Sequence, residues 1–133
     1  MQSHGQLRWL GGTRDDAAGE CFDKCARVLG LGYPGGPAIA AAAAQIPIIN
    51  YQLPNKLPRP MIEGKNFDFS FSGLKTAVFR EIQELKSNQQ LSNSAIQQLA
   101  HEIQEAITDV LVVKTLRAAE KYQVKSIVLG GGV

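Results

Sequence analysis

The sequence predicts a predominantly helical α/β fold with four or five helices and one or two short strands. Long segments place apolar residues at every third or fourth position, phenylalanines alternate with polar residues over positions 67–71, and an apolar run at 126–129 directly precedes three glycines. A chain of 133 residues that is 44% apolar can bury a core. We therefore expect residues 1–133 to form one compact unit, with residues 1–6 disordered or foreign to the natural chain.

The first predicted helix lies in the stretch DDAAGECFDK at positions 15–24 and extends to about Leu29. Thr13 or Asp15 is its expected cap. One stripe of this helix is polar and consists of Asp16, Glu20, Asp23 and Arg27. The opposite stripe is apolar and consists of Ala18, Phe22, Cys25 and Leu29. The apolar stripe predicts burial, and the polar stripe offers carboxylates either to solvent or to the hydroxyl groups of a ligand.

A glycine-rich turn follows the first helix. Its glycines surround Tyr33 and Pro34 and are Gly30, Gly32, Gly35 and Gly36. Glycines at this density let the backbone come close to a ligand, so an acidic helix followed by such a turn suits a ribose and its neighbouring phosphates. A second helix is expected over positions 37–45, because Pro37 fits a first helical turn and the alanines favour helix.

Two further helices follow from apolar periodicity. The first is capped by Ser72 and buries a stripe formed by Leu74, Val78, Ile82 and Leu85. The second begins with a capping box between Ser94 and Gln97 and runs to about Tyr122. Its apolar positions are Ile96, Leu99, Ile103, Ile107, Val110, Leu111 and Leu116. Positions 47–65 are rich in proline and predict an irregular connection.

The remaining segments predict extended structure. Positions 67–71 indicate a short strand or extended arm whose aromatic side anchors the core, and positions 7–10 suit the end of a strand. Positions 126–129 predict a buried strand. The backbone N–H groups of Gly131 and Gly132 after that strand would meet phosphate if a helix followed.

Four ordered motifs, DDAAGECFDK, LGLGYPGGP, FDFSFSGLKTA and LGGGV, resemble the signature of the catalytic subunit of the tRNA threonylcarbamoyladenosine synthase family, formerly called glycoprotease or O-sialoglycoprotein endopeptidase. The resemblance covers nearly the whole chain from about Leu10. It implies a fragment of an actin-like, Hsp70-like and sugar-kinase-like nucleotide-binding domain, namely the helical subdomain with its flanking strands. Family members are two-domain enzymes, so the resemblance makes these residues the central part of a longer chain.

The resemblance also implies an activity and a set of ligands. The full-length enzyme transfers a threonylcarbamoyl group from threonylcarbamoyl-adenylate to the exocyclic nitrogen of an adenosine in tRNA. Asp23 is then the expected acceptor for ribose hydroxyls, with Glu20 a weaker neighbour and Gly36 allowing close backbone approach. Lys24 is a candidate phosphate contact, although the pattern favours a surface lysine whose ammonium stays in solvent. The expected partners of the full-length protein are tRNA, a paralogous actin-like-fold subunit and a small ATPase.

The metal of the family is not expected in this segment. Family members hold one divalent metal, iron or zinc, through an HxxxH pair and a late aspartate, whereas this chain contains only His4 and His101. We therefore expect no cofactor and no activity from these residues alone, and the uncovered apolar surface of a partial domain predicts self-association. Cys21 and Cys25 match no common zinc or redox spacing and suggest core packing.

Composition limits the other possibilities. The net charge of +2 and the pI near 8.6 do not by themselves indicate nucleic-acid binding. The sequence shows no membrane-spanning run and no secretory signal, which favours the cytoplasm. Three alternatives stay open: another carbamoyltransferase or kinase with an actin-like fold, a metalloprotease, and a helical interaction module.

Overall fold

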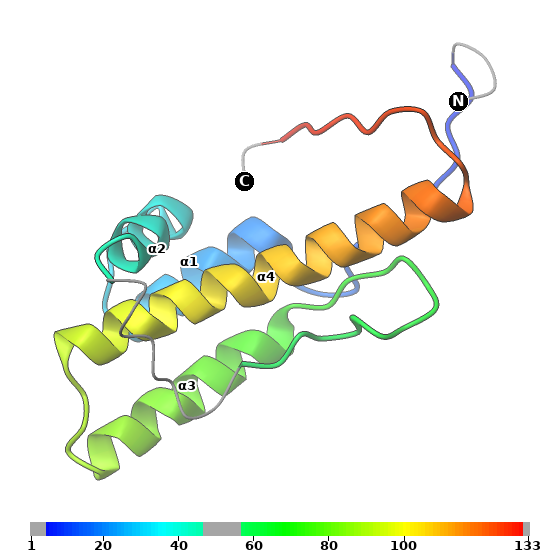
Figure 1. Cartoon of the computed structure of the whole chain (residues 1–133). Helices are drawn as coiled ribbons and strands as arrows, with labels where there is room; N and C mark the ends of the chain where they lie inside the picture. The colour runs from blue at the N-terminus through cyan, green and yellow to red at the C-terminus, as the bar shows by residue number, and fades with distance from the viewer. Residues whose placement is uncertain (1–4, 47–56, 132–133) are drawn as a thin grey trace.

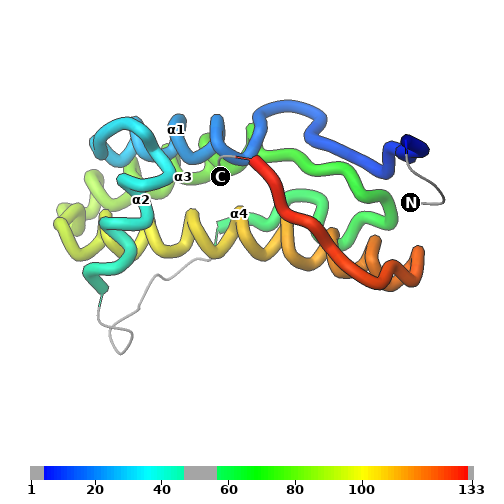
Figure 2. Tube along the Cα trace, turned by 90° about the horizontal axis from the view of Figure 1, so that it is seen from above, coloured from blue at the N-terminus to red at the C-terminus, as the bar shows by residue number. Residues whose placement is uncertain are grey.

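The computed structural model describes residues 5–46 and 57–131 and contains four helices in that part of the chain. They are α1 (Ala18–Leu29), α2 (Gly35–Ala43), α3 (Ser72–Ser87) and α4 (Asn93–Lys121). Helix α4 has 29 residues and runs along the whole bundle, with α1 and α3 beside it and α2 across its N-terminal half (Figure 1). Seen from above, the chain after α4 turns back over the bundle as an extended segment (Figure 2). None of these helices is long and apolar enough to cross a membrane.

The core confirms most of the periodicity read from the sequence, with the exception of Leu116, which is 50% exposed. The stripe of α3 is buried at Leu74, Val78, Ile82 and Leu85, and α4 adds Leu99, Ile103, Ile107 and Val110 to the same core cluster. Helix α1 contributes Phe22 and Leu29 together with Cys21 and Cys25, which are both fully buried. Contact with Cys25, followed by burial, raises the pKa of the Cys21 thiol, so this side chain is a packing group in its neutral form.

Residues 57–71 form an arm that is held to α4 by three cationic side chains, two from α4 and one from the arm itself (Figure 1, green). The fully buried Lys114 donates hydrogen bonds from Nζ to the carbonyl oxygens of Met61 (2.8 Å) and Asp68 (2.7 Å). Arg117 donates to the carbonyl oxygen of Gly64 (2.8 Å). At the other end of the arm, Arg59 pairs with two carboxylates of α4. Burial lowers the pKa of Lys114, and the carbonyl oxygens around it replace the lost water.

The strand predictions were wrong in part. Within the described residues the only β feature is an isolated parallel bridge between Thr13 and Phe69, so positions 67–71 form an extended arm. Its aromatic side does anchor the core, since Phe67 and Phe71 are buried and Phe69 packs against the core cluster. Positions 126–129 are neither a strand nor buried: Val128 is 90% exposed. Positions 7–10 are exposed and irregular as well, because neither segment has a neighbouring strand to pair with in the described structure.

The observed helix N-termini and their capping residues differ from the predicted ones. Helix α1 begins at Ala18 with no side-chain cap, and neither Thr13 nor Asp15 caps it. Helix α2 begins two residues earlier than expected, at Gly35. The cap of α4 is Ser92, which accepts a hydrogen bond from the Ala95 N–H (3.2 Å), so the capping box predicted at Ser94 was wrong. Ser72 is the first residue of α3 and does not cap it with its own side chain.

Candidate functional site

Helices α1, α2 and α4 enclose a groove of about 580 Å³. Its walls are mostly apolar and consist of Gly19, Phe22, Pro34, Gly36, Pro37, Ala40, Ile107 and Leu111. Its polar side chains are Asp23 from α1 and Gln104 and Thr108 from α4. A mainly apolar cleft of this size with a few placed polar groups is typical of a small-molecule site. The structure therefore brings together two residues predicted from the sequence, Asp23 and Gly36.

Asp23 joins α1 to the start of α2. Its Oδ1 accepts a hydrogen bond of 2.8 Å from the backbone N–H of Gly35, the first residue of α2. This contact satisfies one of the unpaired N–H groups of the helix N-terminus and places a negative charge at its positive end. The second oxygen, Oδ2, has no hydrogen-bond partner within the described residues. Asp23 is thus fixed through one oxygen and offers the other as an acceptor beside the groove.

The two adjacent glycines of the turn have different surroundings. A Cβ at Gly35 would lie 2.5 Å from the Asp23 Cα and 2.6 Å from the carbonyl oxygen of Phe22. A Cβ at Gly36 would meet nothing within 4 Å. Gly35 is therefore needed for the close approach of α2 to α1, whereas Gly36 leaves open space at the groove wall.

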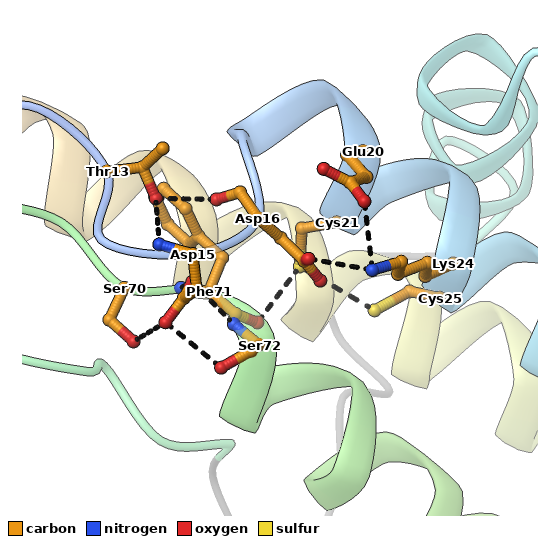
Figure 3. A network of polar contacts seen from close by, with 10 residues as sticks. All are labelled: Thr13, Asp15, Asp16, Glu20, Cys21, Lys24, Cys25, Ser70, Phe71 and Ser72. Atoms are coloured by element: carbon orange, nitrogen blue, oxygen red, sulfur yellow. Dashed lines mark hydrogen bonds and ion pairs between the residues drawn. The ribbon is translucent and has the colours of Figure 1, made fainter.

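Glu20 and Lys24 lie on the polar face of α1, outside the groove lining. The ammonium of Lys24 pairs with Asp16 (2.7 Å) and with Glu20 (2.9 Å), as Figure 3 shows. The hydrogen bonds that the Lys24 ammonium donates to Asp16 and to Glu20 raise the pKa of Lys24. The Lys24 ammonium therefore has two carboxylate partners, one in α1 and one just before it, and neither of them is Asp23.

Sequence reasoning missed the role of Asp15. Its Oδ1 accepts from the backbone N–H groups of Phe71 (2.8 Å) and Ser72 (3.0 Å), and its Oδ2 accepts from the hydroxyls of Ser70 (2.6 Å) and Ser72 (3.0 Å) (Figure 3). Burial is the largest single influence on this carboxyl and opposes its ionisation, but the four bonds together outweigh it and hold the pKa of Asp15 well below its ordinary value of 3.8. Asp15 therefore supplies the missing cap at the start of α3. The signal in the sequence was the pair of serines around Phe71, which supplies donors to a carboxylate.

The whole chain, residues 1–133, matches the family described as TsaD, tRNA N6-adenosine threonylcarbamoyltransferase. It is 50% identical over 133 residues to the tRNA N6-adenosine threonylcarbamoyltransferase of Dehalococcoides mccartyi strain BAV1, covering 100% of this chain and 37% of that protein. The enzyme of the same name from Syntrophomonas wolfei is 47% identical with the same coverage, and that from Persephonella marina is 50% identical over 129 residues, 95% of this chain and 34% of that protein. The chain belongs to the TsaD family. It spans about 37% of the length of the first of these relatives.

The remaining predicted site residues of this TsaD-family chain lie elsewhere. Gly131 is exposed, with φ +115°, in the extended segment after α4, and Gly132 lies outside the described residues. Within the described residues, no group of three or more His, Cys, Asp or Glu side chains is arranged to hold a metal ion. The side chains in the described part of the chain do not fit the divalent metal that the resemblance implied, and we assign no metal-dependent step to them.

Proposed function

We propose that this segment forms the adenylate-binding part of a tRNA N6-adenosine threonylcarbamoyltransferase. Membership of the TsaD family supports the class of enzyme. The observation that carries the proposal is the shared groove of Asp23 and Gly36, where a fixed carboxylate with one open oxygen stands next to a backbone position without a side chain. A carboxylate is a strong acceptor for the two hydroxyls of a ribose.

In the proposed reaction the nucleophile is the exocyclic nitrogen of an adenosine beside the tRNA anticodon. It attacks the carbonyl carbon of the threonylcarbamoyl group, the bond from that carbon to the phosphate oxygen breaks, and AMP leaves. The groove holds the adenosine part of the threonylcarbamoyl-adenylate. Asp23 binds the ribose through Oδ2, and the space at Gly36 lets the ligand approach the start of α2. These contacts contribute by orienting the mixed anhydride for attack.

The other parts of the reaction belong to the full-length protein in this proposal. One divalent metal, iron or zinc, is held outside this segment, and when bound it supplies a Lewis acid. The tRNA, a paralogous actin-like-fold subunit and a small ATPase bind to the full-length enzyme, which works in the cytoplasm. Exposed apolar side chains on α4 and after it support the expectation that the segment alone self-associates; they include Val112, Leu116, Val128 and Leu129.

Substitution of Asp23→Asn in the full-length enzyme tests this proposal. Asparagine keeps an oxygen that accepts from the Gly35 N–H, so the start of α2 is retained, but an NH₂ group replaces the acceptor that faces the ribose. We expect AMP affinity to fall by about 10-fold to 150-fold, which corresponds to the roughly 1.5–3 kcal/mol of a lost charge-assisted hydrogen bond. Calorimetry with AMP and turnover with threonylcarbamoyl-adenylate and unmodified tRNA measure the effect.

The control is Asp16→Asn, which removes a carboxylate of the same motif that pairs with Lys24 outside the groove. It should leave AMP affinity within about twofold of the unsubstituted enzyme, because Asp16 does not line the groove. Unchanged AMP affinity in the Asp23→Asn enzyme would place the ribose site elsewhere and refute the proposal. A full-length enzyme that phosphorylates a sugar, but modifies no tRNA, would instead support the kinase alternative.

A further inference from the structure

The face of α4 that lines the groove carries a second set of polar groups. Gln104, Ile107, Thr108 and Leu111 follow the spacing of one helical face, and all four line the groove opposite α1 and α2. Two of these side chains are apolar and two can form hydrogen bonds. The ribose contact proposed for Asp23 does not use any of them. Their chemistry therefore bears on the part of the ligand that lies beyond the ribose.

The hydrogen-bonding capacity of Thr108 is partly used. Its hydroxyl donates to the backbone carbonyl oxygen of Gln104, one turn earlier, at 2.8 Å. A second carbonyl oxygen, that of Glu105, lies 3.3 Å away. When the hydroxyl proton makes this bond to the helix backbone, the hydroxyl oxygen presents its lone pairs to the groove. Thr108 is therefore an acceptor at this site.

The side-chain amide of Gln104 has no hydrogen-bond partner within the described residues, although the residue is partly buried. It offers one carbonyl acceptor and two N–H donors. Together, Gln104 and Thr108 present two acceptor oxygens and one NH₂ group with two N–H donors, flanked by the aliphatic side chains of Ile107 and Leu111. A flat ligand that offers an amino group beside a ring nitrogen would satisfy this arrangement.

We propose that Gln104 and Thr108 read the amino edge of the adenine base, so that this face of α4 determines the choice of purine. The inference rests on the proposed function and deepens it. The Gln104 carbonyl accepts from the N6 amino group and its N–H donates to the neighbouring ring nitrogen, which is the bidentate pairing that glutamine makes with adenine. Thr108 accepts from the same amino group. Ile107 and Leu111 contact the ring.

A 6-oxopurine such as hypoxanthine or guanine fits this wall poorly. Its O6 is an acceptor and would face the lone pairs of the Thr108 oxygen. It would also face the lone pairs of the Gln104 carbonyl oxygen, unless the side-chain amide of Gln104 turns over. Turning the amide over corrects the Gln104 contact only, and a favourable contact with Thr108 would require its hydroxyl to give up the 2.8 Å bond to the Gln104 carbonyl oxygen. Sites that hydrogen-bond a substrate N–H discriminate against analogues that lack it, since the polar groups of the site are then left unpaired.

Binding of AMP and IMP to the full-length protein tests the inference, because the two nucleotides share ribose and phosphate and differ at the base edge. We expect AMP to bind at least about tenfold tighter than IMP, the discrimination typical of a good bidentate contact. Gln104→Leu should weaken AMP binding by about tenfold, leave IMP binding nearly unchanged and bring the two affinities to within about threefold. Thr108→Val, which keeps the shape of the side chain, should reduce the AMP preference by a smaller factor.

The matched control is Gln83→Leu, the same substitution at an exposed position of α3 outside the groove. It should leave both affinities and their ratio unchanged. An AMP preference that survives Gln104→Leu, in a protein where Asp23→Asn weakens AMP and IMP equally, would overturn this inference while the proposed function stands. If Asp23→Asn affects neither nucleotide, both the groove assignment and this reading of α4 are wrong. Thermal melting of each variant shows that a loss of binding does not come from unfolding.

Discussion

Asp15 and Asp23 come from one ten-residue motif and serve two junctions of different character. At the first junction, residues 12–16 meet residues 68–72, and both oxygens of Asp15 are saturated by four donors. At the second, α1 meets α2 beside the groove, and Asp23 uses one oxygen for the Gly35 N–H. The difference separates a carboxylate that holds two segments together from one that keeps bonding capacity for a ligand. Neither the residue type nor its position in the motif separates the two roles. The number of hydrogen bonds that each carboxylate accepts does separate them.

The largest effect is expected from breaking the second junction at its backbone. Gly35→Ala would put a methyl group 2.5–2.6 Å from backbone atoms of Phe22 and Asp23, which cannot move without separating α2 from α1. We expect a loss of about 3 kcal/mol or more in the free energy of unfolding, the upper range for overpacking. Gly36→Ala is the matched control, because its Cβ meets nothing within 4 Å. It should change stability by less than about 1 kcal/mol. Urea denaturation measures both, and equal losses would contradict the contrast drawn between these glycines.

A smaller effect is expected at the first junction from Asp15→Asn. Asparagine can still accept from the Phe71 and Ser72 N–H groups, but the charge and the second acceptor are lost. The expected cost is about 1–2 kcal/mol at pH 7, the usual range for a weakened helix cap. AMP affinity should be retained, since Asp15 does not line the groove. A variant that lost AMP binding at full stability would show that the two junctions are not separate.

The pH dependence of this same variant sharpens the test. The pKa of Asp15 is lower in the folded state than its ordinary 3.8, so its stabilisation is complete above that value and is lost as pH falls through the folded pKa. The stability difference between the unsubstituted protein and Asp15→Asn should thus stay constant from pH 7 to about 4 and shrink below it. The hydrogen bond from Arg14 also lowers the pKa of Asp68, so both proteins weaken in acid, and only their difference reports Asp15.

The smallest effect is expected at Glu20, which belongs to neither junction. Its ion pair with Lys24 is exposed, and Lys24 keeps its shorter contact with Asp16 when Glu20 is neutralised. Glu20→Gln should change stability by less than about 0.5 kcal/mol and AMP affinity by less than about twofold. Calorimetry and urea denaturation check both values. A tenfold loss of AMP affinity would restore Glu20 as a ribose ligand.

The bodies of the helices could be predicted from the sequence because burial follows spacing. The stripe of α3 from Leu74 to Leu85 was correctly identified for this reason. Caps and strands depend on partners that spacing does not reveal. Asp15 bonds to residues 55 to 57 positions away, so a local capping rule assigned it to the wrong helix. The apolar run at 126–129 suits a strand, but a strand needs a neighbour to pair its backbone.

Only the side of the groove formed by α1 and the start of α2 could be predicted from the sequence. An acidic helix before a glycine turn led to Asp23 and Gly36, because both halves of that pattern are adjacent in the sequence. The α4 wall was not predicted, since Gln104 and Thr108 are separated from Asp23 by more than 80 positions and look like ordinary polar residues of a long helix. Gln104 and Thr108 come to line the groove with Asp23 only through the packing of α4 on α1 and α2.

The length of α4 has a mechanical consequence. The helix lines the groove up to Leu111 and, within its next turns, holds the 57–71 arm through Lys114 and Arg117. At 1.5 Å per residue, Thr108 and Lys114 are separated by only about 9 Å along a continuous hydrogen-bonded rod. We therefore expect the groove wall and the arm to be mechanically coupled through this one continuous helix. Their backbone amides should become open to hydrogen exchange together, in a single cooperative event, and not one before the other.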